Sequence, residues 1–191
     1  MIAHFDVSRE RSLRAIEEAM EQDQRIYLVT QSNVDREDPT QEDLYRMGIV
    51  ADIKQVVRLQ NDVVRILVDG ISRAKLLGFT GRKKYLEAEI CYCDSNADSL
   101  PEDLKEAMLL GVREAFHRYA AVIGKISKEL IRQIDQYEDL EKLIDYVTNN
   151  LPVSYELKQQ VLEAEDINDR YQVIVSLLLS QVEVISIKNE L

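Results

Sequence analysis

The feature that most constrains the fold is a change in the spacing of apolar residues near the middle of the chain. Before the change, apolar and polar residues alternate, as in a half-buried strand, and one face of segment 85–93 carries Leu86, Ala88, Ile90 and Tyr92. After the change, apolar residues recur every three or four positions, as on one face of a helix. The sequence therefore predicts an α+β fold, with a β-rich subdomain over residues 1–97 and an all-α helical bundle over residues 98–191.

The first subdomain begins with a mixture of strand and helix signals. Short strands are predicted at Ile2–Val7 and Arg25–Gln31, and Ser8 is a plausible N-cap for a helix between them. The polar segment 32–46 predicts a loop that holds one helical turn at Glu42–Arg46.

The most β-prone region follows this loop. Ile49–Leu59 and Val63–Val68 are rich in Val and Ile, and they flank Asn61-Asp62, a pair that tolerates positive φ. These segments predict a hairpin whose second strand ends at Gly70. A further strand is predicted over Tyr85–Cys93.

The boundary falls in the polar stretch 94–99, which leads to Pro101, a helix-start signal. Five apolar stripes at helical spacing follow, and we interpret them as packing surfaces of a bundle. Asp166 is the predicted cap of the last helix, which is long.

The chain is strongly acidic, with a net charge of −11 and a pI near 4.7. A nucleic-acid-binding surface needs clustered Lys and Arg, and the one basic run, Arg82-Lys83-Lys84, is typical of a solvated turn. The N-terminus lacks the pattern of a signal peptide, and no run of about 18 apolar residues predicts a membrane span. We therefore expect neither nucleic acid nor membrane as a partner.

The residues that usually carry chemistry are sparse. Cys91 and Cys93 are too close on one strand for an unstrained disulfide, which favours a reducing cytoplasm. Together with His4 and His117 they lack the spacing of a zinc site. The sequence contains no phosphate-binding G-x-x-x-x-G-K-[ST] loop, no G-x-S-x-G elbow and no G-x-G-x-x-G turn. We predict no catalytic, cofactor-binding or metal-binding residues, and the residues alone indicate an interaction module.

Several segments extend this interpretation, because their order and spacing resemble the N-terminal, substrate-binding domain of Lon-type ATP-dependent proteases. These segments are Asp6–Met20, Pro39–Tyr45, Gly48–Lys54, Val63–Gly70 with Arg73-Ala74, Leu151–Glu163 and Asp166–Arg170. The family commonly has glycine at the positions of Ser8 and Asp62. It also normally begins with a strand carrying a Leu-Pro-x-Arg motif, and its fifth helix normally runs on towards an ATPase domain. The resemblance therefore implies that this chain starts just after that strand and stops within that helix.

The resemblance implies a PUA-like first half, a helical second half and a non-catalytic role in a cytoplasmic protease. That protease is a hexamer with an AAA+ motor, which uses ATP and magnesium, and a Ser–Lys dyad, none of which map onto this chain. The implied role is to bind unfolded or damaged polypeptides and to support hexamer assembly. The implied partners are those substrates and the AAA+ and protease domains of the same polypeptide. No substrate-binding residues are carried over.

Other readings remain open. One is a free-standing LON-domain interaction module with no attached protease, which the full reading frame decides. A small-molecule reader similar to cereblon would need an aromatic cage and zinc cysteines, and the chain has no Trp and no C-x-x-C. An uncharacterised enzyme is disfavoured by the missing motifs. RNA binding by analogy with other PUA-like folds is disfavoured by the acidic charge.

Overall fold

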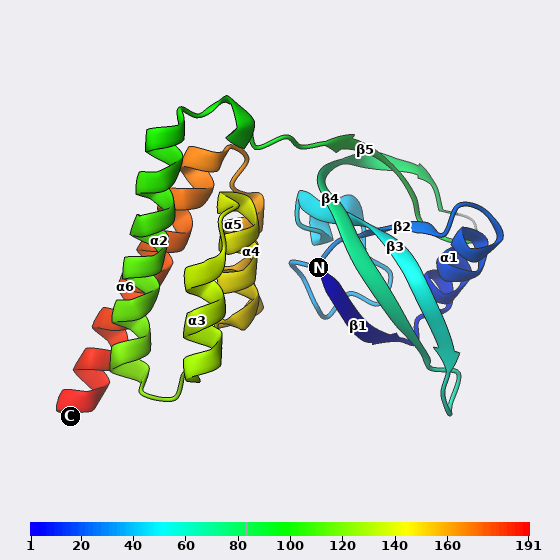
Figure 1. The fold of residues 1–191 in the computed structure, drawn as a ribbon. Helices are drawn as coiled ribbons and strands as arrows, with labels where there is room; N and C mark the ends of the chain where they lie inside the picture. The colour runs from blue at the N-terminus through cyan, green and yellow to red at the C-terminus, as the bar shows by residue number, and fades with distance from the viewer. Residues whose placement is uncertain (83) are drawn as a thin grey trace. The chain divides into compact units, whose positions relative to one another are not determined.

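The computed structural model describes residues 1–82 and 84–191, so Lys83 of the basic run lies outside the described residues. The chain divides into two compact units, Met1–Cys93 and Asp94–Leu191 (Figure 1). The first holds the antiparallel sheet and the second is helical, so the predicted α+β class is confirmed. That the two units fold independently stays a prediction.

The first unit is a five-stranded sheet with one helix against it. Strand order is β1-β4-β3-β2, and β5 pairs with the second half of β4. The elements are β1 (Ile2–Val7), α1 (Glu10–Glu21), β2 (Arg25–Leu28), a 3-10 turn (Gln41–Asp43), β3 (Met47–Arg58), β4 (Val64–Gly81) and β5 (Glu87–Tyr92).

The β3–β4 hairpin forms where the sequence predicts it. Asn61 and Asp62 have φ of 60° and 59°, so both adopt the left-handed conformation that this tight turn requires. The prediction that Gly70 ends the second strand is wrong, because β4 continues to Gly81. Gly70 instead pairs with Ala51 beside a register irregularity at which β4 carries the extra residue, Ile71, and glycine tolerates the local bend without ending the strand.

Two smaller predictions are also corrected. Arg9, in an extended conformation, precedes α1 directly, so Ser8 is not the cap. The helical turn lies at Gln41–Asp43 and not at 42–46. Thr40 and Asp43 form a reciprocal capping box there, and the chain is extended again at Leu44.

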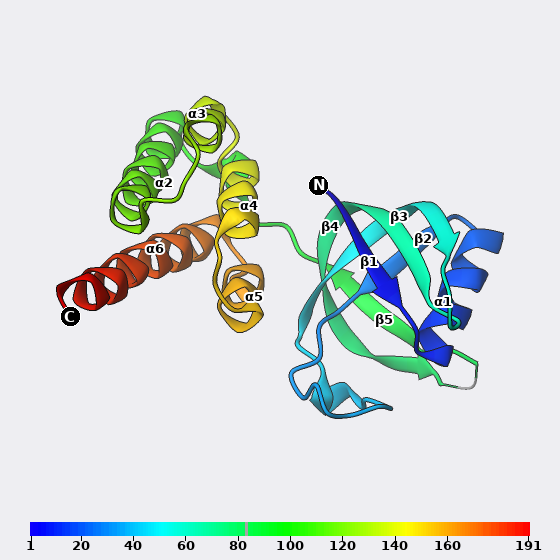
Figure 2. The same ribbon diagram turned by 90° about the horizontal axis from the view of Figure 1, so that it is seen from below.

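The core of the first unit lies between α1 and the sheet. Ile16 and Ala19 of α1 pack against sheet residues that are almost completely buried, and these are Ala51, Ile53, Ile66 and Val68. The α1 helix lies beside β2 at one side of the curved sheet (Figures 1 and 2). This placement leaves part of the same apolar interior accessible, as described below.

The second unit is a bundle of five helices. They are α2 (Glu102–Ile123), α3 (Lys128–Gln136), α4 (Leu140–Asn150), α5 (Tyr155–Glu163) and α6 (Ile167–Glu190). The Asp166 side chain accepts a hydrogen bond from the Asp169 amide, which confirms it as the cap of α6. The core is built on α2, α4 and α6, with Val112, Phe116, Leu143, Ile144, Ile174 and Leu178 fully buried.

Among the described residues, α6 alone is long and apolar enough to pass a length-and-composition test for a membrane span. A mostly buried core helix of a water-soluble protein passes the same test, and 17% of the apolar window of α6 is buried among the described residues. One face of α6, including Ile174 and Leu178, packs in the bundle, and the buried Arg170 lies in its first turns. The helix therefore has a packing partner already within its own unit.

Candidate functional site

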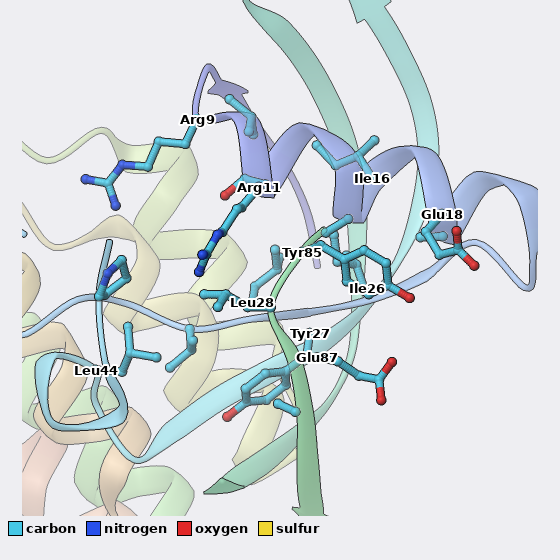
Figure 3. Close-up of a pocket in the computed structure, with 18 of the residues that line it drawn as sticks. Arg9, Arg11, Ile16, Glu18, Ile26, Tyr27, Leu28, Leu44, Tyr85 and Glu87 are labelled. Atoms are coloured by element: carbon cyan, nitrogen blue, oxygen red, sulfur yellow. The ribbon is translucent and has the colours of Figure 1, made fainter. Parts of the chain in front are cut away.

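A half-open groove lies in the first unit. Its volume is about 1000 Å³. It runs between α1, β2, the strand β5 with the residues just before it, and the loop that joins β2 to β3 (Figure 3). The groove is therefore formed wholly by the β-rich unit.

The floor and walls of the groove are mainly apolar. Ile16, Ile66 and Leu76 form buried parts of its floor. Half-buried side chains form its walls, and these include Phe5, Val7, Ile26, Leu28, Leu44, Phe79, Leu86, Ala88 and Ile90. Half-buried apolar side chains around an open space can still lose water-exposed area when a ligand binds, which is favourable.

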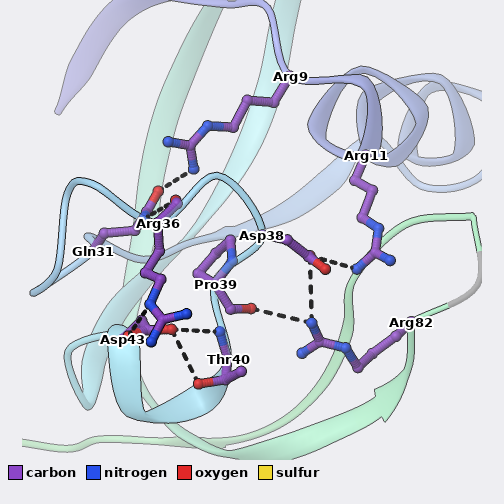
Figure 4. Close-up of polar contacts among 9 residues, drawn as sticks. All are labelled: Arg9, Arg11, Gln31, Arg36, Asp38, Pro39, Thr40, Asp43 and Arg82. Atoms are coloured by element: carbon purple, nitrogen blue, oxygen red, sulfur yellow. Dashed lines mark hydrogen bonds and ion pairs between the residues drawn. The ribbon is translucent and has the colours of Figure 1, made fainter.

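The loop that forms one wall is held in place by a polar network centred on Asp38 (Figure 4). Its carboxylate accepts hydrogen bonds from Arg11 of α1 at 2.8 Å and from Arg82 at 3.4 Å. Arg82 also donates to the Pro39 carbonyl at 3.3 Å, and its guanidinium lies 5.0 Å from the centroid of the Phe79 ring. Asp38 therefore ties the loop both to α1 and to the end of β4.

A second set of contacts orders the same loop from within. Asp43 accepts hydrogen bonds from the backbone amide of Thr40 at 2.9 Å and from its hydroxyl at 3.1 Å. The Thr40 amide is the main reason that the pKa of Asp43 lies below its usual value, and Arg36, 3.8 Å away, acts in the same direction. Arg9 donates to the side chain of Gln31, which in turn donates to two loop carbonyls. The loop that forms this wall of the groove is therefore ordered by its own hydrogen bonds.

The rim of the groove carries more acidic than basic residues. The lining includes six carboxylates and three guanidiniums, and these are Glu10, Glu18, Asp23, Glu37, Asp38 and Glu87 against Arg9, Arg11 and Arg25. Desolvation raises the pKa of the Tyr85 hydroxyl, and the charges of Glu18 and Glu87 raise it further. Both carboxylates therefore place negative potential at the end of the groove where Tyr85 lies (Figure 3).

The arrangement offers binding chemistry, in the form of apolar walls and a charged rim. Cys91 is exposed, Cys93 is half-buried, and neither forms a disulfide. No group of three or more His, Cys, Asp or Glu side chains in residues 1–82 and 84–191 could hold a metal ion. His117 pairs with Asp135 at 2.7 Å in the helical unit, far along the chain from the cysteines. The absence of catalytic and metal sites stays a prediction.

Sequence reasoning named no binding residues and missed the groove. Its signals were present, because the apolar faces of α1 and β5 are both readable as periodic patterns. Periodicity shows which residues of an element face inward. It does not show whether the inward faces of two elements pack together or leave a groove between them.

Comparisons with known proteins are consistent with this architecture. Residues 1–180 match the family profile described as "ATP-dependent protease La (LON) substrate-binding domain". The chain is 37% identical over 191 residues to a Lon protease of Lachnoclostridium phytofermentans. The aligned region covers 100% of this chain and 24% of that protein. It is 32% identical to a Lon protease of Clostridioides difficile, with coverage of 100% and 25%. The chain thus spans about a quarter of the length of the relatives it matches.

Solved structures show the same fold. The N-terminal domain of a Mycobacterium avium complex Lon protease matches with a TM-score of 0.73 at 19% identity, over 93% of this chain and 89% of that one. The Lon N-terminal domain protein from Xanthomonas campestris matches with a TM-score of 0.61 at 12% identity, over 92% and 89%.

Proposed function

Because the chain belongs to the family of ATP-dependent protease La (LON) substrate-binding domains, we propose that it binds unfolded or damaged polypeptides through the groove of its β-rich unit. The observation that supports this most directly is the half-open apolar groove with an acidic rim. Apolar contacts accept many sequences, which suits a module that meets unrelated unfolded proteins.

The proposal extends to the protein of which this chain forms a part. It places the chain in a cytoplasmic ATP-dependent protease whose AAA+ motor and Ser–Lys dyad lie in other domains. Several copies in a hexamer would raise the effective concentration of binding sites around one substrate. Each site can therefore be weak, with a Kd of about 10 μM or more, which corresponds to about 7 kcal/mol or less.

The test is a titration of a fluorescently labelled unfolded protein, and of its native form, with the purified chain. We expect tighter binding of the unfolded form, and weaker binding at 500 mM than at 50 mM salt because the rim is charged. Equal affinity for the two forms, or no binding up to millimolar concentration, would contradict the proposal.

The groove itself is tested with a matched pair of variants. Ile90 lines the groove on β5, whereas Ile71 on β4 is 45% exposed and lies outside the lining. We expect Ile90→Ser to weaken binding of the unfolded protein severalfold and Ile71→Ser to leave it unchanged. Equal effects of the two substitutions would place the binding surface elsewhere.

A role in assembly is supported by the last turns of α6. Val184 and Ile187 are 41% and 59% exposed there, while Ile185 between them packs against the bundle. We expect concentration-dependent association of the chain in sedimentation equilibrium, reduced by Ile187→Glu, because exposed apolar patches favour association. A wild-type chain that stays monomeric at high concentration would leave substrate binding as its role.

A further inference from the structure

The outer edge of β5 is open along the groove. Within the described residues β5 pairs with β4 alone. The amide of Cys93, just after the strand, donates to the Arg73 carbonyl of β4 at 3.0 Å. Backbone amides alternate in direction along a strand, and both register irregularities of this pair skip a residue of β4 and none of β5. The amides of Ala88 and Ile90 therefore point away from β4, on the side where a further strand would pair.

The same two residues place their side chains in the groove. Ala88 and Ile90 line it from β5, and Ile26 and Leu28 line it from β2. β2 is the edge strand at one end of the sheet order, and β5 lies off that order, paired with β4. The groove thus lies between two edge strands of a curved sheet, a place where an extended segment can add backbone hydrogen bonds to apolar contacts.

We propose that the polypeptide bound in this groove adds as a β-strand to the open edge of β5, with apolar side chains at alternate positions directed into the groove and a lysine or arginine near Glu18 and Glu87. This inference rests on the proposed function and defines its binding mode. The six residues of β5 are matched by a segment about 20 Å long. Strand addition through the backbone imposes little sequence requirement, which fits recognition of many substrates.

Charge complementarity supports a basic occupant. Glu18 projects from α1 and Glu87 from β5, at the same end of the groove as the Tyr85 ring (Figure 3). Both carboxylates raise the pKa of the Tyr85 hydroxyl, after the larger effect of desolvation, so their charges act in a partly desolvated place. A lysine or arginine there relieves this concentration of negative charge, whereas an acidic side chain is repelled.

The backbone contribution is tested with an acetylated eight-residue peptide of alternating Val and Lys, titrated against the whole chain. Two methylated versions carry N-methyl groups on alternate amides, one version on the Val residues and the other on the Lys residues. Methylation removes donors from one edge of the strand only. We expect at least one version to bind at least tenfold more weakly than the parent peptide. If both versions bind as tightly as the parent, strand addition is wrong.

The location is tested by amide hydrogen exchange with the same peptide. We expect new protection at Ala88 and Ile90, whose amides point away from β4, and little change in the amides that already pair with it. Protection confined to β1 or β2 would overturn the assignment to β5.

The charge preference is tested with matched double variants. Glu18→Gln with Glu87→Gln removes both rim charges, whereas Glu17→Gln with Glu89→Gln removes the same charge from exposed neighbours outside the lining. We expect the first pair to weaken binding of the Val/Lys peptide at least fivefold at low salt and the control pair to change it less than twofold. Equal losses would rule out a cation site at Glu18 and Glu87.

Failure of the binding mode is distinguishable from failure of the proposed function. A chain that binds unfolded protein and responds to Ile90→Ser, but binds methylated and parent peptides equally, uses the groove without strand addition. A chain that binds neither unfolded protein nor peptide lacks the proposed function itself.

Discussion

At the scale of single residues, Gly48 is the glycine of the β-rich unit whose neighbours leave the least room for a side chain. A Cβ atom at this position would overlap the Leu28 carbonyl oxygen and lie 2.7 Å from the Tyr27 hydroxyl oxygen. That hydroxyl crosses the sheet to donate to the Ala74 carbonyl at 2.9 Å. Gly48 is therefore required by close packing, not by an unusual backbone conformation.

We expect Gly48→Ala to destabilise the chain by about 3 kcal/mol, because backbone and a hydrogen-bonded ring must move to admit the methyl group. Gly78→Ala is the matched control, since a Cβ there would meet only the flexible Gln41 side chain at 3.5 Å. Urea denaturation of both variants measures the difference. Equal free energies of unfolding would contradict the packing argument.

Asp43 gives the groove wall a pH dependence. Its pKa lies below the ordinary value of 3.8, chiefly because the ionised carboxylate accepts the Thr40 amide. A lowered folded-state pKa contributes stability above the unfolded value, and this contribution is lost as the pH falls through the folded value. We expect the Thr40 amide resonance to titrate with a midpoint below 3.8, and to show no such titration in Asp43→Asn. A wild-type midpoint at or above 3.8 would contradict this account.

At the scale of elements, the helical bundle is tied together by one deeply buried cation. The Arg170 side chain on α6 is 2% exposed, and it donates to Asp145 of α4 at 2.7 Å and to the Val161 carbonyl of α5 at 3.4 Å. Three helices thus meet at one guanidinium. A buried charge that loses its partner is costly, whereas an exposed pair contributes little.

Two side-chain contacts of the same 2.7 Å length, Arg170 with Asp145 and His117 with Asp135, allow this difference to be measured. We expect Asp145→Ala to destabilise the bundle by about 2 kcal/mol, because Arg170 is 2% exposed and loses its carboxylate, although Asp145 itself is 49% exposed. The control Asp135→Ala breaks the pair with His117, in which both side chains are more than 40% exposed, and should cost less than about 1 kcal/mol. Chemical denaturation followed by circular dichroism distinguishes the two. Similar losses of stability in the two variants would show that the burial of Arg170 does not set the cost of removing its partner.

At the scale of the whole molecule, the β-rich and helical units have separate cores. The core of the first is built from α1, β3 and β4, and that of the second from α2 to α6. The compact units meet between Cys93 and Asp94, four residues before the boundary expected from the sequence. The Ser95 carbonyl accepts the Ile167 amide at 2.8 Å, which attaches the polar stretch to the helical unit.

We therefore predict that residues 1–93 and 94–191, produced separately, each fold cooperatively. Each should give a dispersed NMR spectrum and a single thermal transition, because each keeps its own core. Division after residue 97 should destabilise the helical half, since it removes Ser95. A half that is unfolded when separated at 93/94 would show that the units depend on each other.

The amino-acid sequence by itself determined the class of fold, the hairpin at Asn61-Asp62 and the cap at Asp166. These features depend on local physics, namely the period of apolar residues, the residues that tolerate positive φ, and side chains that satisfy free helix amides. The motifs in their order also indicated the family, which the comparisons confirm.

The tertiary structure alone decided the continuation of β4 past Gly70, the burial of Arg170 and the existence of the groove. Each depends on contacts between segments distant in the chain. Gly70 continues the strand because Ala51 pairs with it, and Arg170 is buried because α4 and α5 cover it. The groove is open because α1, β2 and β5 stand apart around it while each presents an apolar face. A periodic pattern specifies the direction of a face, and only the packed chain determines whether that face meets another.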